Sequence, residues 1–513
     1  MHAWCVARGL LCAENTYTAR RGMLMGSTGI NLMEWNNPAI RTLHYAWMAF
    51  FITFILWFGM GPLAAFIKVE FALSDAEWKA LLMLNVAITI PARVLTGMLV
   101  DKFGPRKVYV LVLVVSGGIS IAFACAQTYT QLAIARFLMG FVGAGFVIGI
   151  RLVAEWFPAR NVGLAEGIYG GFGNFGSAAA AALLPLLAAA FAPALGWRIA
   201  LSVAGVMAIL FAFVFYRGVR NTPKGSTYFK PKKSGGLEVS SWQDLWFYLI
   251  MNLPLHIALI VLVWSLAPGH LGLLSQFWAN VAWGVIALLA FYQFRKILHV
   301  NLAHLRDGVP EIQRYKFRQV AILSLAYFAA FGSEIAVVSM LPIFFMDVFG
   351  LTPVQAGFST AGFVVANLVA RPAGGWLSDR IGRRLALAIQ IGGLAVGYAL
   401  MSFIDAGWPL WLALTVTVIN SLFVQAGCGG VYAVIPLIKR SQTGQIAGMT
   451  GAYGNVGGVI FLTVLSFVSA SAFFMIMAAC AAFVFLAVLF LEEPPRQLVE
   501  VLPDGTVELI DVH

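Results

Sequence analysis

The feature that most limits the fold of this chain is a series of apolar segments, each long enough to cross a membrane. A transmembrane helix needs about 20 predominantly apolar residues. The segments lie near 43–67, 78–100, 107–126, 131–154, 163–190, 197–216, 243–266, 272–294, 319–346, 354–377, 384–404, 409–436, 443–469 and 471–491. With 61% hydrophobic and 11% charged residues, the chain has too little polar surface for a soluble globule of 513 residues. The sequence therefore predicts an all-α polytopic membrane protein with 14 transmembrane helices.

Basic residues gather in short stretches between these segments, at 102–107, 217–233, 295–318 and 380–384. Cytoplasmic loops of membrane proteins carry an excess of lysine and arginine, so the net charge of +11 indicates membrane orientation rather than nucleic-acid binding. The segments at 243–294 form one hairpin out of the cytoplasm and back, which keeps every basic stretch on one side. We expect a multi-pass protein of the cytoplasmic (inner) membrane with both termini in the cytoplasm.

The chain divides into five regions on this basis. They are an N-terminal tail (1–42), an N-terminal six-helix half (43–216), basic linkers with an extra transmembrane hairpin (217–318), a C-terminal six-helix half (319–491) and a cytoplasmic tail (492–513). In the tail, apolar residues alternate on both sides of Asp504-Gly505, which predicts a small β-hairpin.

Each half carries one arginine inside an apolar segment. Arg93 precedes Asp101 by eight residues, about 12 Å along a helix with a rise of roughly 1.5 Å per residue. Arg371 precedes Asp379 by the same spacing, and the two arginines are 278 residues apart. An arginine in mid-membrane costs at least about 2.5 kcal/mol, so by default it faces an internal cavity. We expect a duplicated fold in which both guanidinium groups meet at the central interface and bind an anion.

A second motif is also duplicated in the same order. The runs Gly170-Gly-Phe-Gly-Asn-Phe-Gly-Ser177 and Gly451-Ala-Tyr-Gly-Asn-Val-Gly-Gly458 place Asn174 and Asn455 281 residues apart. The first run fits the dinucleotide fingerprint G-x-G-x-x-G, but it follows no strand and lies in an apolar helix, so it lacks the required context. The glycines, including Gly173 and Gly454, either allow close helix packing or let a ligand touch the main chain. The buried asparagines need polar partners.

These motifs resemble those of known transporters. The turns Gly97-Met-Leu-Val-Asp-Lys-Phe-Gly-Pro-Arg106 and Gly375-Trp-Leu-Ser-Asp-Arg-Ile-Gly-Arg-Arg384 resemble the loop motif of the major facilitator superfamily. The two glycine-asparagine runs, taken with the two arginines, resemble the nitrate/nitrite porter family within it. The resemblance implies a 6+6 pseudo-symmetric helix bundle, here with the extra hairpin between the halves.

The resemblance also implies a substrate site. By position, Arg93 and Arg371 would hold the anion, Phe54 and Phe146 would wall it, Tyr327 would donate a hydrogen bond, and Asn174, Asn455, Gly173 and Gly454 would line it. The chemistry is reasonable in its own right, because a guanidinium is flat, always charged and donates hydrogen bonds in a fork that suits a flat oxyanion. Each aromatic residue taken alone fits packing or lipid contact better.

Glu334 is a departure from the family's nitrate/nitrite exchangers, which have an apolar residue at the similar position; proton-coupled members resemble the acidic version. An ionised Glu334 offsets part of the arginine charge, and an arriving anion favours its protonation. Glu334 follows Tyr327 by seven residues, which places it about 10 Å nearer the outer surface. We therefore expect a gate rather than direct contact with the anion, with a permanent counter-ion or a structural hydrogen bond as the alternative.

A separate polar group lies at the cytoplasmic helix ends. It comprises Asp101, Arg106, Glu155, Asp379 and Arg383. By resemblance these residues hold the outward-open state closed on the cytoplasmic side, through charge pairs and a helix dipole. Ordinary solvated turns are the alternative.

The function expected from the sequence is secondary active transport of nitrate, with nitrite as a second substrate, by alternating access and with proton-coupled uptake. The alternatives are nitrate/nitrite antiport, a non-transporting nitrate sensor and a carrier of another small anion. Enzyme and ATPase motifs are absent from the sequence. The expected partners are nitrate, nitrite, protons and the lipid bilayer; no metal, cofactor or nucleic acid is expected.

Overall fold

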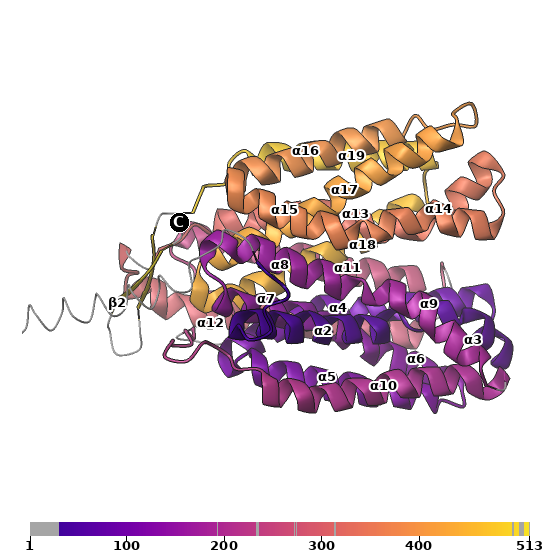
Figure 1. Cartoon of the computed structure of the whole chain (residues 1–513), viewed down its shortest axis with the longest axis horizontal. Helices are drawn as coiled ribbons and strands as arrows, with labels where there is room; N and C mark the ends of the chain where they lie inside the picture. Colours follow the sequence, from indigo (N-terminus) through magenta and orange to yellow (C-terminus); the bar gives the residue numbers. More distant parts are fainter. Residues whose placement is uncertain are drawn as a thin grey trace, which may run out of the picture.

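The computed structural model describes residues 30–191, 193–231, 235–270, 272, 274–311, 314–494, 497–501 and 507–511. Most of the predicted N-terminal tail lies outside this part of the chain. The described residues form two groups of helices that lie side by side, with α11 running between them (Figure 1). The N-terminal group contains α2 (Pro38–Phe58), α3 (Ala64–Glu70), α4 (Asp75–Phe103), α5 (Pro105–Ala124), α6 (Tyr129–Met139), α7 (Gly145–Trp156), α8 (Ala159–Asn174), α9 (Gly176–Ala189) and α10 (Pro193–Gly218), with short 3-10 turns at Gly61–Leu63 and at Gly140–Ala144 (η2).

The extra hairpin and the C-terminal group follow. The hairpin consists of α11 (Trp242–Leu266) and α12 (Gln276–Arg306). The C-terminal group contains α13 (Phe317–Phe349), α14 (Pro353–Val365), α15 (Asn367–Ile381), α16 (Arg383–Met401), α17 (Leu410–Val434), α18 (Thr443–Leu465) and α19 (Ala470–Val488), with 3-10 turns at Ile435–Leu437 and Arg440–Gln442.

Thirteen helices in the described part of the chain are long and apolar enough to span a membrane. The remaining predicted span corresponds to α14 and α15, which break at Ala366 and carry Arg371, Asp379 and Arg380. These charged residues lower its hydropathy, although it packs in the bundle like the other spans. The predicted all-α membrane protein is therefore confirmed, and the 13 spans found among the described residues are close to the predicted 14.

Local sequence explains where two helices differ from the predicted bounds. The first helix begins at Pro38, before the predicted start at residue 43, because the Asn37 side chain caps it by accepting from the Ala39 amide at 3.0 Å. In α12, the helix continues to Arg306, past the predicted end at residue 294. Ile297 and Val300 recur there at helical spacing and are buried, so apolar packing extends the helix beyond the membrane segment.

The C-terminal tail contains the predicted hairpin. Strands β1 (Gln497–Val501) and β2 (Val507–Asp511) pair antiparallel, with Val499 opposite Leu509. The hairpin lies beyond the end of the helical bundle (Figure 1).

Two helix pairs join the halves, and glycines let their backbones touch. In the α4–α18 pair, a Cβ added to Gly97 would lie 2.3 Å from the Gly444 carbonyl oxygen. In the α8–α15 pair, a Cβ added to Gly375 would lie 1.9 Å from the Gly163 carbonyl oxygen. These distances leave no room for a side chain, so the glycines are needed for the close approach of the two halves. This contact places the arginine of each half against a helix of the other half.

Candidate functional site

Arg93 of α4 is buried at the interface between the halves, with 1% of its surface exposed. Its Nε donates to the Gly143 carbonyl oxygen at 3.2 Å, and its Nη1 donates to the Gly451 carbonyl oxygen at 2.6 Å. Gly143 belongs to η2 of the same half, whereas Gly451 belongs to α18 of the other half. Arg93 forms no ion pair within the described residues, so its positive charge faces only neutral acceptors.

Arg371 of α15 is equally buried but has a charged partner. Its Nε donates to Gln425 Oε1 at 3.1 Å, and its Nη2 forms an ion pair with Glu334 Oε2 at 2.9 Å. With the Asn174 amide turned so that its oxygen faces the guanidinium, that oxygen accepts from Nη1 at 2.9 Å and from Nη2 at 2.8 Å. Asn174 lies on α8 of the N-terminal half. Arg371 is thus saturated with partners.

The two arginines follow one pattern across the interface. Each contacts its own half and also the helix of the opposite half that carries the glycine-asparagine run. Arg93 contacts α18, and Arg371 contacts α8. Asn455 takes part as well, because its Nδ2 donates to the same Gly451 oxygen that Arg93 uses, at 3.3 Å. The repeated motifs of the sequence are therefore two equivalent contacts between the halves.

Both guanidinium groups face the same aromatic ring. The Arg93 guanidinium carbon lies 5.2 Å from the centroid of the Phe331 ring, and that of Arg371 lies 5.9 Å from it. The structure thus brings the two arginines to one place. Phe331 was not singled out from the sequence, although it follows Tyr327 by four residues on α13 and therefore shares its helix face.

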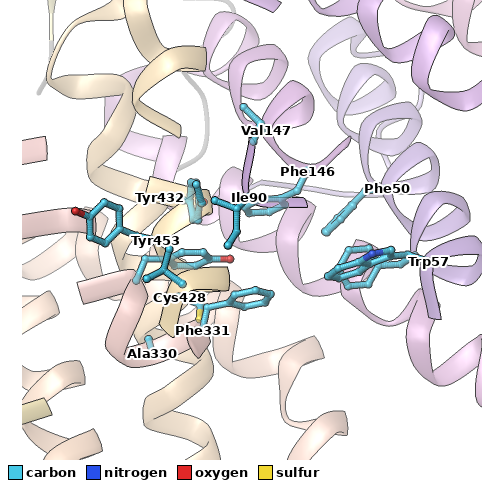
Figure 2. Packing of buried hydrophobic residues seen from close by; sticks show 14 of the residues in the cluster. Phe50, Trp57, Ile90, Phe146, Val147, Ala330, Phe331, Cys428, Tyr432 and Tyr453 are labelled. Carbon is cyan, nitrogen blue, oxygen red and sulfur yellow. The ribbon is translucent and has the colours of Figure 1, made fainter. Parts of the chain in front are cut away.

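A row of aromatic rings crosses the interface beside the arginines. Phe146 of the N-terminal half lies 4.6 Å from Tyr432, and Tyr432 lies 4.9 Å from Tyr327, between ring centroids. Tyr327 in turn stacks on Phe331 at 5.0 Å. Figure 2 shows Phe146, Tyr432 and Phe331 close together. Two of the three predicted aromatic residues, Phe146 and Tyr327, are therefore near the arginines.

Phe54 and the two predicted glycines lie differently from what the resemblance implies. Phe54 packs on Phe50 at 4.4 Å, and Phe50 separates it from Phe146. A Cβ added to Gly173 would lie 1.8 Å from a ring atom of Phe50, and one added to Gly454 would lie 2.7 Å from the Tyr327 ring. Both glycines make room for neighbouring rings, which favours the packing alternative. None of the three touches either guanidinium group.

Glu334 lies beside one of the two arginines. The sequence favoured a gate above the anion site, with a counter-ion as the alternative; the carboxylate pairs with Arg371 and also accepts from Asn367 Nδ2 at 3.1 Å. Glu334 lies two helical turns beyond Tyr327 on α13, and the long side chain of Arg371 reaches it there. The counter-ion alternative therefore describes this state of the molecule.

At the helix ends that the sequence predicts to be cytoplasmic, two aspartates join the halves; we call Asp101, Asp379 and the amides they bind the cytoplasmic latch. Asp101 accepts from the Gly444 and Gln445 amides at 2.9 and 2.8 Å. Asp379 accepts from the Gly163 and Leu164 amides at 3.0 and 2.7 Å. The two pairs of amides are offset by 281 residues, as Asn174 and Asn455 are. The latch therefore has the same two-fold pattern as the arginines and is closed here.

The arginine that supports Asp101 is Arg151, not Arg106 as predicted. Arg151 lies 3.5 Å from Asp101 and 2.9 Å from Glu155, and Glu155 also pairs with Arg440 at 3.4 Å. Arg151 could have been found as an arginine in an apolar run four residues before Glu155.

Arg106 instead donates to the Tyr216 carbonyl oxygen through Nε at 2.8 Å and Nη2 at 2.6 Å, within its own half. Gly104, with φ of 86°, turns the chain there and directs Arg106 toward the end of α10. A side chain at Gly104 would be strained at that φ. Arg383 does lie at the latch, where it pairs with Asp379 and donates to the Ala159 carbonyl oxygen at 2.8 Å.

The linker after α10 adds a contact to the latch. The Tyr228 hydroxyl donates to the Val100 carbonyl oxygen at 2.6 Å, and Arg151 Nη2 donates to the Phe229 carbonyl oxygen at 2.7 Å. Burial raises the pKa of Tyr228 above its ordinary value, so the hydroxyl remains a neutral donor.

Comparison with known proteins assigns the family. The model of the Major Facilitator Superfamily matches residues 46–308 and 323–509. The nitrate/nitrite transporter NrtP of Nostoc punctiforme is 43% identical, over 88% of this chain and 92% of its own length. The chain belongs to the nitrate/nitrite porter family of the major facilitator superfamily. A second member, the nitrate/nitrite transporter NrtP of Picosynechococcus, is 41% identical over 92% of this chain and 96% of its own length.

Solved structures agree with this porter fold. The proton:xylose symporter XylE, bound to 6-bromo-6-deoxy-D-glucose, superimposes with a TM-score of 0.60 at 16% identity, covering 89% of this chain and 96% of the symporter. At this identity the likeness shows the fold alone. The relatives and the fold are those of multi-pass transporters and not of enzymes.

Proposed function

We propose that this chain carries nitrate, and nitrite as a second substrate, into the cell by alternating access, with nitrate uptake coupled to protons. The observation that carries the proposal is the pair of buried arginines from opposite halves that face Phe331 together. The names of its relatives point to the same two anions. The membrane concerned is the cytoplasmic membrane, with both termini inside, as the positions of the basic stretches support.

The charges around the site support an anion as cargo. Arg371 is paired with Glu334, whereas Arg93 is bound only by carbonyl oxygens. A buried charge without a counter-ion is costly, so the site as a whole has an excess of one positive charge to offset. A small flat oxyanion fits because a guanidinium donates charge-assisted hydrogen bonds in its own plane.

Glu334 supports coupling to protons. An anion that binds both arginines must compete with Glu334 for the Arg371 guanidinium, since the carboxylate already occupies Nη2 at 2.9 Å. Protonation of Glu334 removes its charge and frees Arg371 for the anion. A proton and a nitrate ion therefore load together, and the net charge of the site stays at +1 because the charges of the proton and the anion cancel.

The cytoplasmic latch explains how loading leads to release. In this state, Asp101 and Asp379 hold the cytoplasmic ends of the halves together through four backbone amides. Opening toward the cytoplasm must break these bonds. An anion shared by arginines of both halves draws the halves together at the centre. Because the anion binds the two states of the carrier with different affinities, its binding shifts the equilibrium between them.

Nitrate/nitrite exchange is the second candidate, and the state of Arg93 favours it. If Glu334 stays ionised throughout the cycle, a bound anion brings the net charge of the site from +1 to zero, so the loaded carrier would change state more readily than the empty one. Transport would then require an anion in both directions.

Transport of nitrate into proteoliposomes, with external pH and internal nitrite varied independently, separates the two. Symport predicts acceleration by external acid without internal anion, and Glu334→Gln should abolish that acceleration while nitrate binding remains. Acceleration only by trapped nitrite would establish exchange instead. Binding of nitrate without any flux would favour the sensor alternative, and a preference for lactate over both anions would overturn the proposed substrate.

A further inference from the structure

Tyr432 of α17 occupies the centre of the interface but has no part in the function described so far. It is buried, with 2% of its surface exposed. Its ring stands at 88° to Phe146 of the N-terminal half and at 87° to Tyr327 of the C-terminal half. Figure 2 shows Tyr432 beside Phe146, where helices of the two halves meet.

The hydroxyl of Tyr432 is the unusual feature. It is buried and, although the Tyr327 side chain lies beside it, it makes no hydrogen bond of good geometry with a described residue. Buried polar groups in proteins are nearly always paired, and an unpaired one costs about 1–3 kcal/mol. A phenylalanine would fill the same space without that cost. The hydroxyl therefore calls for a partner that this structure does not include.

The position of the hydroxyl identifies the kind of partner. A Cβ added to Gly451 would lie 3.1 Å from the Tyr432 hydroxyl oxygen, 3.1 Å from Arg93 Cδ and 3.2 Å from Arg93 Nη1. The hydroxyl and the Arg93 guanidinium thus flank the same point on α18. Arg93 is the arginine without an acidic partner, and Arg93 Nη2 donates to no described residue. A neutral donor beside an unpaired guanidinium is suited to an anion.

We infer that the Tyr432 hydroxyl donates a hydrogen bond to an oxygen of the anion that Arg93 holds, and that this bond favours nitrate over nitrite. The inference rests on the proposed function and adds a specificity residue to it. Nitrate has three oxygens. When the two arginines bind two of them, the third is free to accept from the hydroxyl. Nitrite has only two oxygens, so it cannot satisfy all three donors in the same way.

The test compares Tyr432→Phe with the wild type as full-length purified protein. Nitrate and nitrite dissociation constants are measured by calorimetry, and transport is measured in proteoliposomes. Because a hydrogen bond to a charged group contributes about 1.5–3 kcal/mol, the substitution should weaken nitrate binding by about tenfold or more. Nitrite binding should change much less, so the ratio of the two affinities should shift toward nitrite.

Tyr315→Phe is a matched control. Tyr315 also has a buried hydroxyl without a partner among the described residues, but it lies just before α13, where its amide donates to Ser240 Oγ at 2.8 Å. This substitution should leave both dissociation constants unchanged. A purely structural role for an unpaired hydroxyl would affect the melting temperature in both variants and the affinity ratio in neither.

Two outcomes would overturn the inference. One is an unchanged nitrate affinity in Tyr432→Phe, and the other is an equal loss for both anions. Should the variant fold poorly, 3-fluorotyrosine placed at position 432 in the wild-type background gives a second measurement, since its more acidic hydroxyl is a stronger donor and should tighten nitrate binding. Wild-type protein that binds neither anion would instead refute the proposed function itself.

Discussion

At the scale of single residues, the two arginines have the same place in the duplicated sequence but different electrostatic surroundings. Arg371 is neutralised by Glu334, while Arg93 donates to the carbonyl oxygens of Gly143 and Gly451. Main-chain carbonyls position a guanidinium without cancelling its charge. In the proposed mechanism, Arg93 therefore supplies the standing attraction for an anion, and Arg371 becomes available when Glu334 is protonated.

Replacing Arg93 with lysine tests this division. Lysine keeps the charge but holds its three donors on one nitrogen without the planar fork, so it cannot reach the two carbonyl groups and an oxyanion in the directions that Arg93 uses. We expect Arg93→Lys to weaken nitrate binding at least about tenfold, the value of one charge-assisted hydrogen bond. Calorimetry on the purified variant is the measurement.

Arg106→Lys is the control for that experiment, because Arg106 contacts Tyr216 near the end of α10 and lies outside the site. It should bind nitrate as the wild type does. Equal nitrate affinity in Arg93→Lys and wild type would mean that Arg93 only packs the two halves together.

The spacing of residues along the chain was sufficient to predict the two arginines, both asparagines and the two aspartates. It was insufficient for Phe331, Tyr432 and Gln425, because these aromatic and amide side chains are of types that more often pack in a helical core. Only the helix crossing that brings α13 and α17 to the arginines distinguishes them. Arg106 was wrong for a related reason, since the direction of a side chain after the Gly104 turn depends on a backbone dihedral angle.

At the scale of helices, the glycine-asparagine helices α8 and α18 each connect an arginine to the cytoplasmic latch. Asp379 binds the start of α8, and Asn174 at the other end of α8 contacts Arg371. In the same way, Asp101 binds amides at the start of α18, and Arg93 donates to the Gly451 carbonyl oxygen further along α18. A shift of either helix must change both contacts, so anion binding and latch opening are mechanically linked.

Arg151 gives the latch its charge balance, and its removal should favour the open state. Arg151→Ala leaves Asp101 and Glu155 buried without their main counter-ion, a loss of about 3–5 kcal/mol for a broken buried pair. Spin labels at the cytoplasmic ends of α4 and α18 should show a longer distance in the variant. Arg106→Ala should leave the distance unchanged, and a similar opening in both variants would contradict the role given to Arg151.

Glu166 on α8 is a buried carboxyl group whose two oxygens have no hydrogen-bond partner among the described residues. An unpaired carboxylate is far more costly to bury than a neutral group of the same shape. We therefore expect Glu166→Gln not to lower the melting temperature of the purified protein. Glu155→Gln should lower it, because Glu155 is ion-paired with Arg151 and Arg440. A clear destabilisation by Glu166→Gln would reveal a charged partner in another state of the transporter.

At the scale of the whole molecule, two six-helix halves meet in a pattern with approximate two-fold symmetry, and the extra hairpin breaks that symmetry. The Tyr453 hydroxyl of α18 donates to the Met251 carbonyl oxygen of α11 at 2.5 Å, so the hairpin rests on the α4–α18 pair. Hydrophobic patterning predicted the number of helices and their order. It could not predict which side of the interface the hairpin covers, because that depends on packing between segments far apart in the sequence.

Nitrate should stabilise the folded molecule as a whole, because one ion shared by Arg93 and Arg371 ties the two halves together. A ligand at 100 times its dissociation constant adds about 2.7 kcal/mol to the free energy of unfolding. We expect nitrate, and less strongly nitrite, to raise the melting temperature of the purified protein, whereas chloride and lactate at the same ionic strength should not.

The double variant Arg93→Gln and Arg371→Gln should lose this thermal shift, and each single glutamine variant should lose most of it, because glutamine removes both the charge and the fork of the guanidinium. The single and double variants should lose nearly the same thermal shift because one ion is shared. When either arginine is altered, the anion no longer joins the halves. If the two single variants each lost half of the shift, each half would bind its own anion independently. The central premise, one ion between two halves, would then be wrong even if both arginines contact nitrate.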